Sequence, residues 1–341
     1  MKLAIVLFNL GGPDSPEAVE PFLRNLFSDP AIISLPAIFR KPLAWLIARR
    51  RAPIAAEIYA KIGGRSPILE ETQAQARALE GALASTGHEV LAFIAMRYWK
   101  PFSDETAAMV KDWGADHVVL LPLYPQFSST TTRSSLADWD RAATTAGLQV
   151  PQSRICCYPC EKGFVEAEVE LIRAAWLRKK PHVDYRLLLS AHGLPKRTIS
   201  KGDSYQWQVE KTAAAIVDGL GIENLDVQIC YQSRVGPLEW IAPATDAEIR
   251  RTGRDGKGVI VAPIAFVSEH SETLVELDIE YSELAANSGV VDYIRVPTVS
   301  TQPLFIEGLA RLVLEAAQDG GTVNGCGARI CPREYSKCIH F

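Results

Sequence analysis

Eight apolar, β-branched-rich runs, separated by longer stretches with helical periodicity, constrain the fold of this chain more than any other feature. Such alternation predicts a parallel sheet covered by helices, and hence an α/β fold class. The runs lie near residues 2–9, 89–96, 116–123, 153–158, 184–191, 225–231, 258–267 and 291–297. Each half of the chain therefore contributes one four-stranded parallel sheet.

The two halves also match in the residues that follow their strands. LFNLGGP corresponds to LLSAHGLP, MRYWKP to CYQSRVGP, and VVLLPLYPQFSSTTTRSS to VIVAPIAFVSEHSETL. We interpret the match as an internal duplication that gives two doubly wound domains. The expected domains are residues 1–160 and 161–318, followed by a cysteine-containing C-terminal extension, residues 319–341.

Composition and charge exclude several classes of protein. The 341 residues are 48% hydrophobic and 22% charged, as in an ordinary soluble protein, and a net charge of −4 predicts no nucleic-acid partner. The opening MKLAIVLFNLGGP reads as a buried strand rather than a signal peptide, and no apolar run reaches membrane-spanning length. We therefore expect a cytoplasmic protein, whose oligomeric state is open and can include a homodimer.

One apolar segment near the N-terminus allows two interpretations. Residues 31–51 are rich in large apolar side chains but contain Pro36 and Pro42 and end in three arginines. They form either a surface helix pair over the core or an apolar lip that touches a membrane surface or an apolar ligand.

Polar residues at the carboxyl ends of the predicted strands are the candidates for chemistry, because ligands of doubly wound sheets bind there. His192 ends an unbroken apolar strand, in LLLSAHGLP, and could act as a general base beside carboxylates. A structural histidine is the alternative. The other candidates at strand ends are Asn9, Arg97, Tyr98, Gln126, Ser128, Gln232, Arg234, Glu269, His270 and Glu272.

The stretch FVSEHSETLVELDIEY, residues 266–281, predicts a helix that begins at Ser268. At about 100° per residue, Glu269, Glu272, Glu276 and Glu280 would share one stripe of an α-helix. A solvated acidic face is the ordinary explanation, but Glu276 and Glu280 lie beyond the first turn, where the helix dipole no longer favours acids. Stacked carboxylates could instead bind a cation in transit or pass protons.

The corresponding segment of the first half, PQFSSTTTRSS, offers hydroxyl groups and Arg133. These suit a helix cap or an anion, and capping is the safer interpretation. Neither LGGP nor IGGRSP matches a glycine-rich phosphate loop, so we expect no nucleotide cofactor.

Seven cysteines are unevenly distributed. Cys326, Cys331 and Cys338 lie in the extension, with four and six residues between them, and Cys156, Cys157 and Cys160 lie mid-chain. This spacing fits an iron-sulfur cluster at least as well as a zinc site, while buried or free thiols remain the alternative.

Taken together, these motifs resemble the ferrochelatase family, which inserts ferrous iron into a porphyrin in the last step of haem synthesis. The matching stretches, in order, are LFNLGGP, IGGRSPI, MRYWKP, LYPQFSSTTT, LSAHGLP, CYQSRVGPLEWIAPAT and FVSEHSETLVELDIEY, and they span nearly all of residues 2–310. The resemblance implies two Rossmann-like, chelatase-type domains that hold protoporphyrin IX in the cleft between them.

The resemblance also implies roles for particular residues. His192 and Glu272 would be catalytic, and both would join Glu276, Glu280 and, less closely matched, Asp278 along the route of Fe²⁺. Residues 31–53 would form the lip, with peripheral contact to the inner face of the cell membrane. The expected substrate-binding residues are Leu10, Arg97, Tyr98 and Trp240 from the resemblance, and Ser128 and His270 from their places at strand ends.

Family members with a cysteine-containing extension bind a 2Fe-2S cluster through one internal and three tail cysteines. The resemblance therefore implies Cys326, Cys331 and Cys338 as ligands, and we choose Cys160 as the internal one because it follows Pro159 in a loop. Two other functions stay open from the sequence. One is a related chelatase, for coproporphyrin or cobalt, and the other is a non-catalytic protein that senses iron or redox state.

Overall fold

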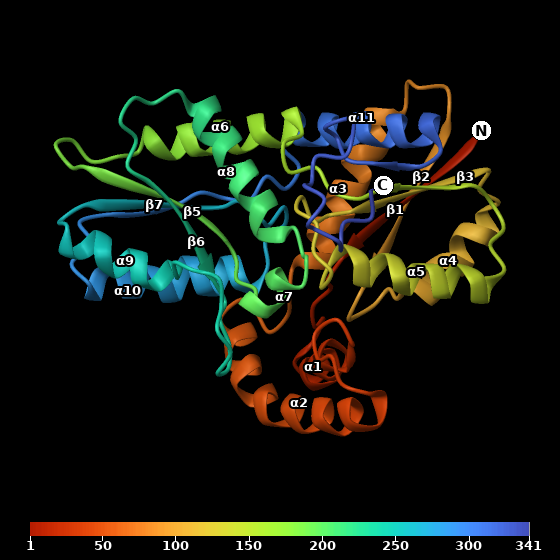
Figure 1. Ribbon diagram of the computed structural model, residues 1–341, viewed down its shortest axis with the longest axis horizontal. Helices are drawn as coiled ribbons and strands as arrows, with labels where there is room; N and C mark the ends of the chain where they lie inside the picture. Colours follow the sequence, from red (N-terminus) through yellow and green to blue (C-terminus); the bar gives the residue numbers. More distant parts are fainter. Residues whose placement is uncertain (341) are drawn as a thin grey trace. The chain divides into compact units, whose positions relative to one another are not determined.

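The computed structural model describes residues 1–340, and its core is two separate parallel sheets. The first has the strand order β2-β1-β3-β4-β9 and the second the order β6-β5-β7-β8 (Figure 1). The α/β fold class with two parallel sheets flanked by helices is confirmed. The first sheet has five strands rather than four, because the extension supplies β9 (Thr322–Val323), which pairs in parallel with β4.

Seven of the eight predicted strands lie within three residues of their expected ends. The strands are β1 (Lys2–Asn9), β2 (Glu89–Met96), β3 (His117–Pro122), β4 (Gln152–Ile155), β5 (Tyr185–His192), β6 (Val227–Gln232), β7 (Gly258–Pro263) and β8 (Tyr293–Arg295). The exception is β7, which ends four residues early, at Pro263, where the ring removes a backbone donor. β4 ends at Ile155, so the prediction that Cys156 and Cys157 lie on the strand is wrong.

Helices connect the strands and cover the sheets. They are α1 (Val19–Ser28), α2 (Ala37–Ala60), α3 (Ile68–Leu83), α4 (Ser103–Trp113), α5 (Thr132–Ala146), α6 (Lys162–Trp176), α7 (Lys196–Ser200), α8 (Tyr205–Leu220), α9 (Thr245–Arg254), α10 (Tyr281–Asn287) and α11 (Pro303–Asp319), with a 3₁₀ turn at Pro16–Ala18 and a π-helix at Glu272–Glu280. Helix-covered parallel strands are buried on both faces, which explains why β1, β5 and β7 are almost wholly apolar.

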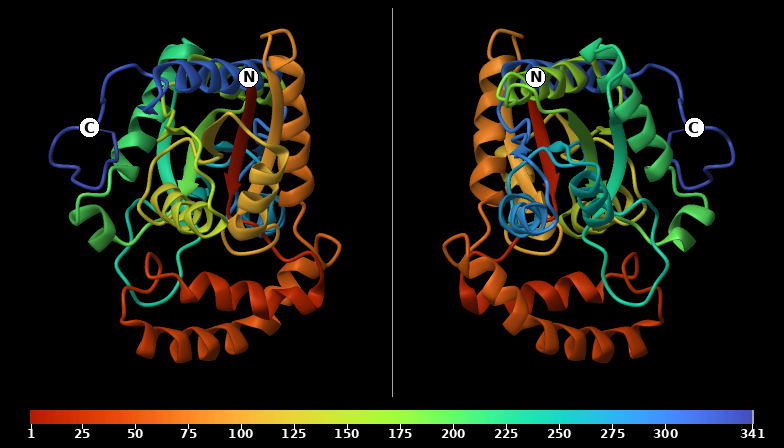
Figure 2. Two further views of the ribbon diagram at one scale, coloured as in Figure 1. Left: turned by 90° about the vertical axis from the view of Figure 1, so that its right-hand side faces the viewer. Right: turned by 90° about the vertical axis from the view of Figure 1, so that its left-hand side faces the viewer.

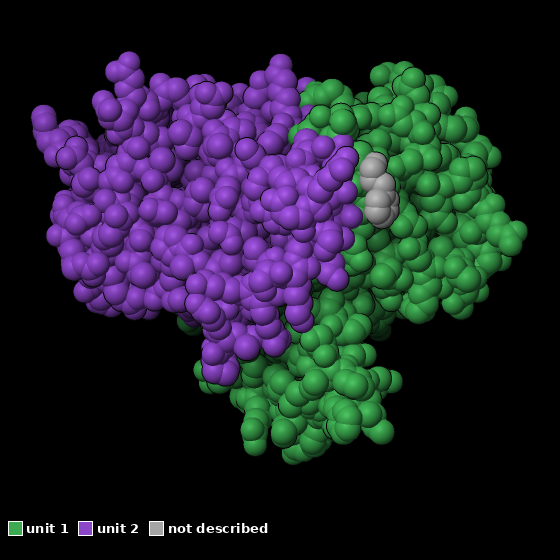
Figure 3. Space-filling model, viewed as in Figure 1, with its two compact units in different colours: residues 1–157, 309–328, 339–341 green, residues 158–308, 329–338 purple. Residues whose placement is uncertain are grey.

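The chain divides into two compact units, coloured separately in Figure 3. Unit 1 comprises residues 1–157, 309–328 and 339–341, and unit 2 comprises residues 158–308 and 329–338. The first division falls three residues before the boundary expected from the sequence. The extension does not stand apart, since its residues are shared between the two units.

The segment expected as a lip is one helix rather than a pair. α2 runs for 24 residues and contains Pro42 and Pro53. It lies beside α1, away from the sheet of unit 1, in each view (Figures 1 and 2). Among the helices of residues 1–340, none has the length and apolarity to span a bilayer.

Candidate functional site

The carboxyl end of β5 places His192 at the edge of the second sheet. Its Nδ1 lies 2.6 Å from the carbonyl oxygen of Gly193, and because a carbonyl only accepts, this nitrogen carries the proton. Gly193 is required there, since a Cβ would lie 2.9 Å from the Gln232 carbonyl oxygen and 3.2 Å from the Trp240 ring. The backbone thus orients the imidazole with its Nε2 toward the acids of the π-helix.

Glu272 lies between two histidines of unit 2. Its carboxylate oxygens are 3.5 Å from His192 Nε2 and 3.5 Å from His270 Nε2. The Nδ1 of His270 is 3.0 Å from the Ser268 carbonyl oxygen, so this ring is also oriented by the backbone. The structure therefore brings together three of the residues predicted from the sequence.

The charges of this trio shift the pKa values of its members. Burial disfavours the charged imidazole, but the Glu272 carboxylate outweighs it and raises the pKa of His192 to about 9. Burial likewise disfavours the carboxylate, yet His192 and His270 hold the pKa of Glu272 well below its ordinary range. At neutral pH the resting site is an imidazolium paired with a carboxylate.

The acidic stripe differs from the expected α-helix in where it begins and in its geometry. Helical structure starts at Ser271 rather than at Ser268, and His270 precedes it, with its backbone N–H donating to Thr273 Oγ1 and its Nδ1 3.0 Å from the Ser268 carbonyl oxygen. Residues 272–280 form a π-helix, whose i→i+5 bonds change which side chains lie above one another. The angles between the side chains of Glu272, Glu276 and Glu280 around the helix axis therefore differ from those expected for an α-helix.

Glu269, the first acid of the predicted stripe, and Asp278, on the predicted route, have another partner. Arg295, on β8, lies 2.6 Å from Glu269 and 2.5 Å from Asp278, and the Thr298 N–H donates to Glu269 at 3.0 Å. The Arg295 guanidinium is the main reason that the pKa of Glu269 is lowered despite burial. Arg295 was not foreseen, since only the fold brings β8 beside the π-helix.

Glu276 accepts hydrogen bonds from several donors. The backbone N–H and hydroxyl of Ser233 lie 2.9 and 2.5 Å from its oxygens, Tyr281 Oη 2.8 Å and Gln232 Nε2 3.1 Å. Ser233 has a left-handed backbone (φ 62°), so the carboxylate holds a strained turn in place. Gln232 was predicted from the sequence as a strand-end candidate, whereas no sequence pattern predicted a role for Ser233.

In unit 1, Arg97 and Tyr98 face an acid that the sequence analysis missed. Asp29 lies 2.9 Å from both the Arg97 guanidinium and the Tyr98 hydroxyl. Leu10 packs in the same small core as Tyr98, and Ser128 is buried after β3 with its hydroxyl 2.9 Å from that of Thr130.

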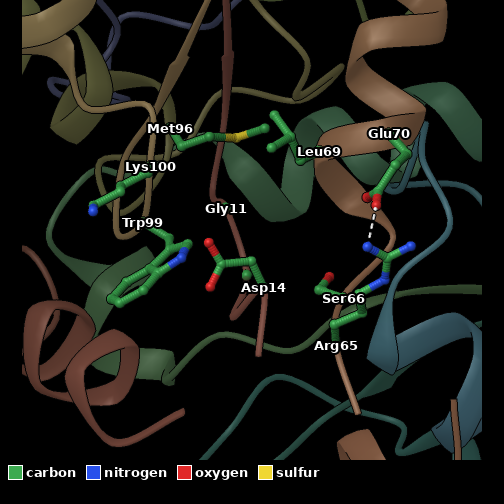
Figure 4. A pocket seen from close by; sticks show the side chains of 10 residues that line it. Gly11, Asp14, Arg65, Ser66, Leu69, Glu70, Met96, Trp99 and Lys100 are labelled. Carbon is green, nitrogen blue, oxygen red and sulfur yellow. Dashed lines mark ion pairs between the residues drawn. The ribbon is translucent and has the colours of Figure 1, made fainter. Parts of the chain in front are cut away.

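A small cavity of about 140 Å³ lies beside the carboxyl ends of β1 and β2. Figure 4 shows the Asp14 carboxylate and the Trp99 indole beside it, and Arg65 paired with Glu70 at 3.2 Å. Ligand pockets usually measure about 300–1,000 Å³. This cavity is thus too small for a tetrapyrrole, and no histidine lines it.

The cysteines only partly fulfil the arrangement that a cluster needs. Cys331 and Cys338 are buried and in side-chain contact, and this contact, with burial, raises the pKa of the Cys331 thiol well above its ordinary range. Gln208 Nε2 on α8 lies 3.1 Å from Cys331 Sγ, and Thr212, one turn along, donates to the Pro159 carbonyl just before Cys160. Cys326 lies in the tail segment of unit 1.

Within residues 1–340, no three His, Cys, Asp or Glu side chains converge as a ready metal site. The structure thus gathers two of the four expected cluster sulfurs and brings the loop of the third to the same helix. A further pair, Cys156 and Cys157, has its sulfur atoms 3.2 Å apart, in contact with Phe127.

Comparison with known proteins identifies the family of this chain. The ferrochelatase family model matches residues 2–317. A ferrochelatase of Caulobacter vibrioides is 54% identical over 99% of this chain and 97% of its own, and one of Rickettsia bellii is 46% identical over 100% and 95%.

Among solved structures, SirB from Bacillus subtilis with Fe³⁺ superposes with a TM-score of 0.56 at 15% identity, covering 94% of this chain and 97% of that one. The sirohydrochlorin chelatase SirB from Bacillus subtilis subspecies spizizenii, in complex with cobalt, gives 0.55 at 13%. These two likenesses support the fold alone. Family model and relatives together show that this chain belongs to the ferrochelatase family, the metal chelatases of haem biosynthesis.

Proposed function

We propose that this enzyme inserts Fe²⁺ into protoporphyrin IX, releasing two pyrrole protons, and that His192 and Glu272 carry the reaction. The observation that supports these roles most directly is the position of Glu272 between two backbone-oriented imidazoles. The reaction needs a proton acceptor and an oxygen ligand for a hard cation close together.

The protonation state of the pair suggests the order of events. An imidazolium cannot accept a proton, so His192 must first lose the one that Glu272 stabilises. Fe²⁺ arriving at Glu272 would replace the imidazolium as the counter-charge and lower the pKa of His192, so that its Nε2 proton passes to solvent. His192 then accepts a pyrrole proton, so metal arrival and proton removal are coupled through one carboxylate.

We further propose that Glu276 and Glu280 extend this site as metal or proton ligands. Glu280 follows Glu276 by four residues at the end of the π-helix. The donors around Glu276 make it a poor resting ligand, so a cation would reach it only by displacing Ser233 or Tyr281.

The test is anaerobic incubation with Fe²⁺ and protoporphyrin, followed by the haem absorption spectrum. We expect His192→Ala to abolish turnover while leaving porphyrin binding, measured by fluorescence, near that of the wild type. An active His192→Ala enzyme would refute the proton-acceptor role. A wild-type rate in a Glu276→Gln, Glu280→Gln double variant would remove the extended route.

Protoporphyrin rather than coproporphyrin is proposed from the apolar lip, residues 31–53. The exposed side chains on and before α2 include Ile38, Phe39, Trp45, Leu46 and Leu35, near the cations Arg49 and Arg50. Such a surface suits an apolar macrocycle and the surface of an anionic bilayer. We propose Leu10, Arg97, Tyr98, Ser128, Trp240 and His270 as substrate-contacting or substrate-positioning residues.

Parallel assays with protoporphyrin, coproporphyrin, Fe²⁺ and Co²⁺ test the substrate choice, and coproporphyrin turning over faster would reverse it. Flotation with anionic vesicles tests the membrane contact. We expect an Ile38→Ser, Phe39→Ser variant to stay unbound, and binding equal to that of the wild type would exclude this surface.

We also propose that Cys160, Cys326, Cys331 and Cys338 hold a 2Fe-2S cluster. The support is the contact between Cys331 and Cys338 and the approach of the Pro159–Cys160 loop to the same helix. Thiols with a raised pKa are protonated without metal, so cluster binding would release protons. Visible and EPR spectra of anaerobically purified protein test this, and a colourless, iron-free protein would refute it.

A further inference from the structure

The two helices α1 and α2 and their connection, residues 19–60, form an arm with a small core that also includes Tyr98, after β2. Val19, Phe22 and Leu23 of α1 pack against Ala48 and Tyr59 of α2. Ala44 of α2 is also buried, but several large apolar side chains of this helix are exposed, with Ile38, Phe39 and Ile54 at 76%, 64% and 62%. A helix pair of this size has too little core to hold a fixed position alone, so its place depends on its anchor.

The anchor is Asp29, directly after α1, whose side chain is 2% exposed. One carboxylate oxygen accepts the Ala31 N–H at 2.8 Å, which shapes the start of the α1–α2 connection. The other accepts from the Arg97 guanidinium at 2.9 Å, the Tyr98 hydroxyl at 2.9 Å and the Ser134 hydroxyl. Asp29 therefore ties the arm both to the residues following β2 and to α5.

Arg97 is committed to the same network. Its Nε lies 2.7 Å from Ser134 Oγ, and its guanidinium lies 5.1 Å from the Tyr98 ring. The guanidinium side chain is 19% exposed, so few of its donors remain for any ligand. The Asn25 side chain adds a bond from α1 to the Tyr98 carbonyl at 3.1 Å.

We propose that Asp29 is a positioning residue for porphyrin binding: through Arg97, Tyr98 and Ser134 it fixes the arm on the sheet of unit 1. The buried carboxylate contacts no substrate. Asp29 limits the movement of the apolar side chains of α2. It therefore affects the Michaelis constant for porphyrin rather than the turnover rate. This inference rests on the proposed function, in which the arm contacts the porphyrin.

The test compares Asp29→Asn with Asp104→Asn, in the same unit. Asp104 pairs with Arg141 at 2.8 Å but is half-exposed, so its loss removes an ion pair without touching the arm. Ser134→Ala is the second variant, since it removes one donor without leaving a charge unpaired. The readouts are amide hydrogen exchange, resolved by peptide, and steady-state kinetics with protoporphyrin and Fe²⁺.

We expect Asp29→Asn to speed exchange in α1 and α2 at least about tenfold, while β1 and β3 keep wild-type rates. We expect the KM for porphyrin to rise about tenfold, equivalent to about 1.4 kcal/mol, with kcat within about twofold. Ser134→Ala should shift both readouts in the same direction, less strongly.

If the amides of α1 and α2 exchanged no faster in Asp29→Asn and Ser134→Ala than in Asp104→Asn, the proposal that Asp29 anchors the arm would be overturned. Exchange accelerated equally over all of unit 1 would also overturn it, because Asp29 would then be an ordinary stability residue. An unchanged KM despite a loosened arm would overturn the positioning role. A wild-type enzyme that forms no haem would refute the proposed function instead, while the exchange data would still decide whether Asp29 anchors the arm.

Discussion

Replacing Glu272 with Gln should lower the pKa of His192 from about 9 to the ordinary 6.5 or below. The glutamine keeps the shape of the side chain but removes the charge that stabilises the imidazolium. Burial, which opposes the charged ring, then acts without a counter-charge.

The size of the change follows from the two pKa values. With a pKa of about 9, only about 1 in 100 wild-type molecules carries a neutral His192 at pH 7. If neutral His192 is the base, wild-type kcat/KM should rise about tenfold per pH unit from pH 6.5 and level off near pH 9. The variant's profile should level off near pH 6.5, at whatever absolute rate it retains.

Two measurements check this prediction. NMR of histidine-labelled protein follows each ring through its titration, and His117 of unit 1 serves as an internal control that Glu272→Gln leaves unchanged. Anaerobic haem formation gives the kinetic profile. A His192 signal that titrates near pH 9 in the variant, or a wild-type profile that is flat from pH 6.5 to 9, would refute the reasoning.

The same pair links stability to pH with a definite sign. The folded pKa of His192 lies above the 6.5 of an unfolded histidine, so its stabilisation is complete below pH 6.5 and is lost as the pH rises through 9. The difference in thermal midpoint between wild type and Glu272→Gln should therefore shrink between pH 7 and pH 10.

Three further predictions concern stability, each measured by chemical or thermal unfolding. Glu168 is fully buried, its carboxyl has no hydrogen-bond partner among the described residues, and burial raises its pKa. We expect Glu168→Leu to be about 1–3 kcal/mol more stable than the wild type at pH 8, with a smaller gain at pH 4. A loss of stability at pH 8 would contradict this. Glu276→Ala should lower the free energy of unfolding by about 2–4 kcal/mol, because it leaves Ser233 in its left-handed turn without an acceptor. Unchanged stability would show that the turn does not need the Glu276 carboxylate. Gly253→Ala should cost more than about 2 kcal/mol, since the added Cβ would lie 2.0 Å from the Ser288 carbonyl oxygen, and an unchanged midpoint would mean that the backbone gives way.

The sequence alone determined the alternation of strands and helices, the ends of most strands and the acids and histidines at their carboxyl ends. These features depend on local periodicity and on the rule that doubly wound sheets bind ligands at one edge. His192, His270 and Glu272 could be predicted in this way because each lies at the carboxyl end of an apolar strand or in the segment that follows it.

Tertiary structure decided which polar groups meet, because partners distant in the chain leave no local signal. Arg295 neutralises Glu269 and Asp278 across 17 to 26 residues, and Asp29 meets Ser134 across 105. The π-helix at residues 272–280 was likewise not foreseen, since the spacing of the acids predicted an α-helix. Periodicity places side chains on a face, but only packing shows whether a carboxylate on that face is open to a ligand or already satisfied by the protein.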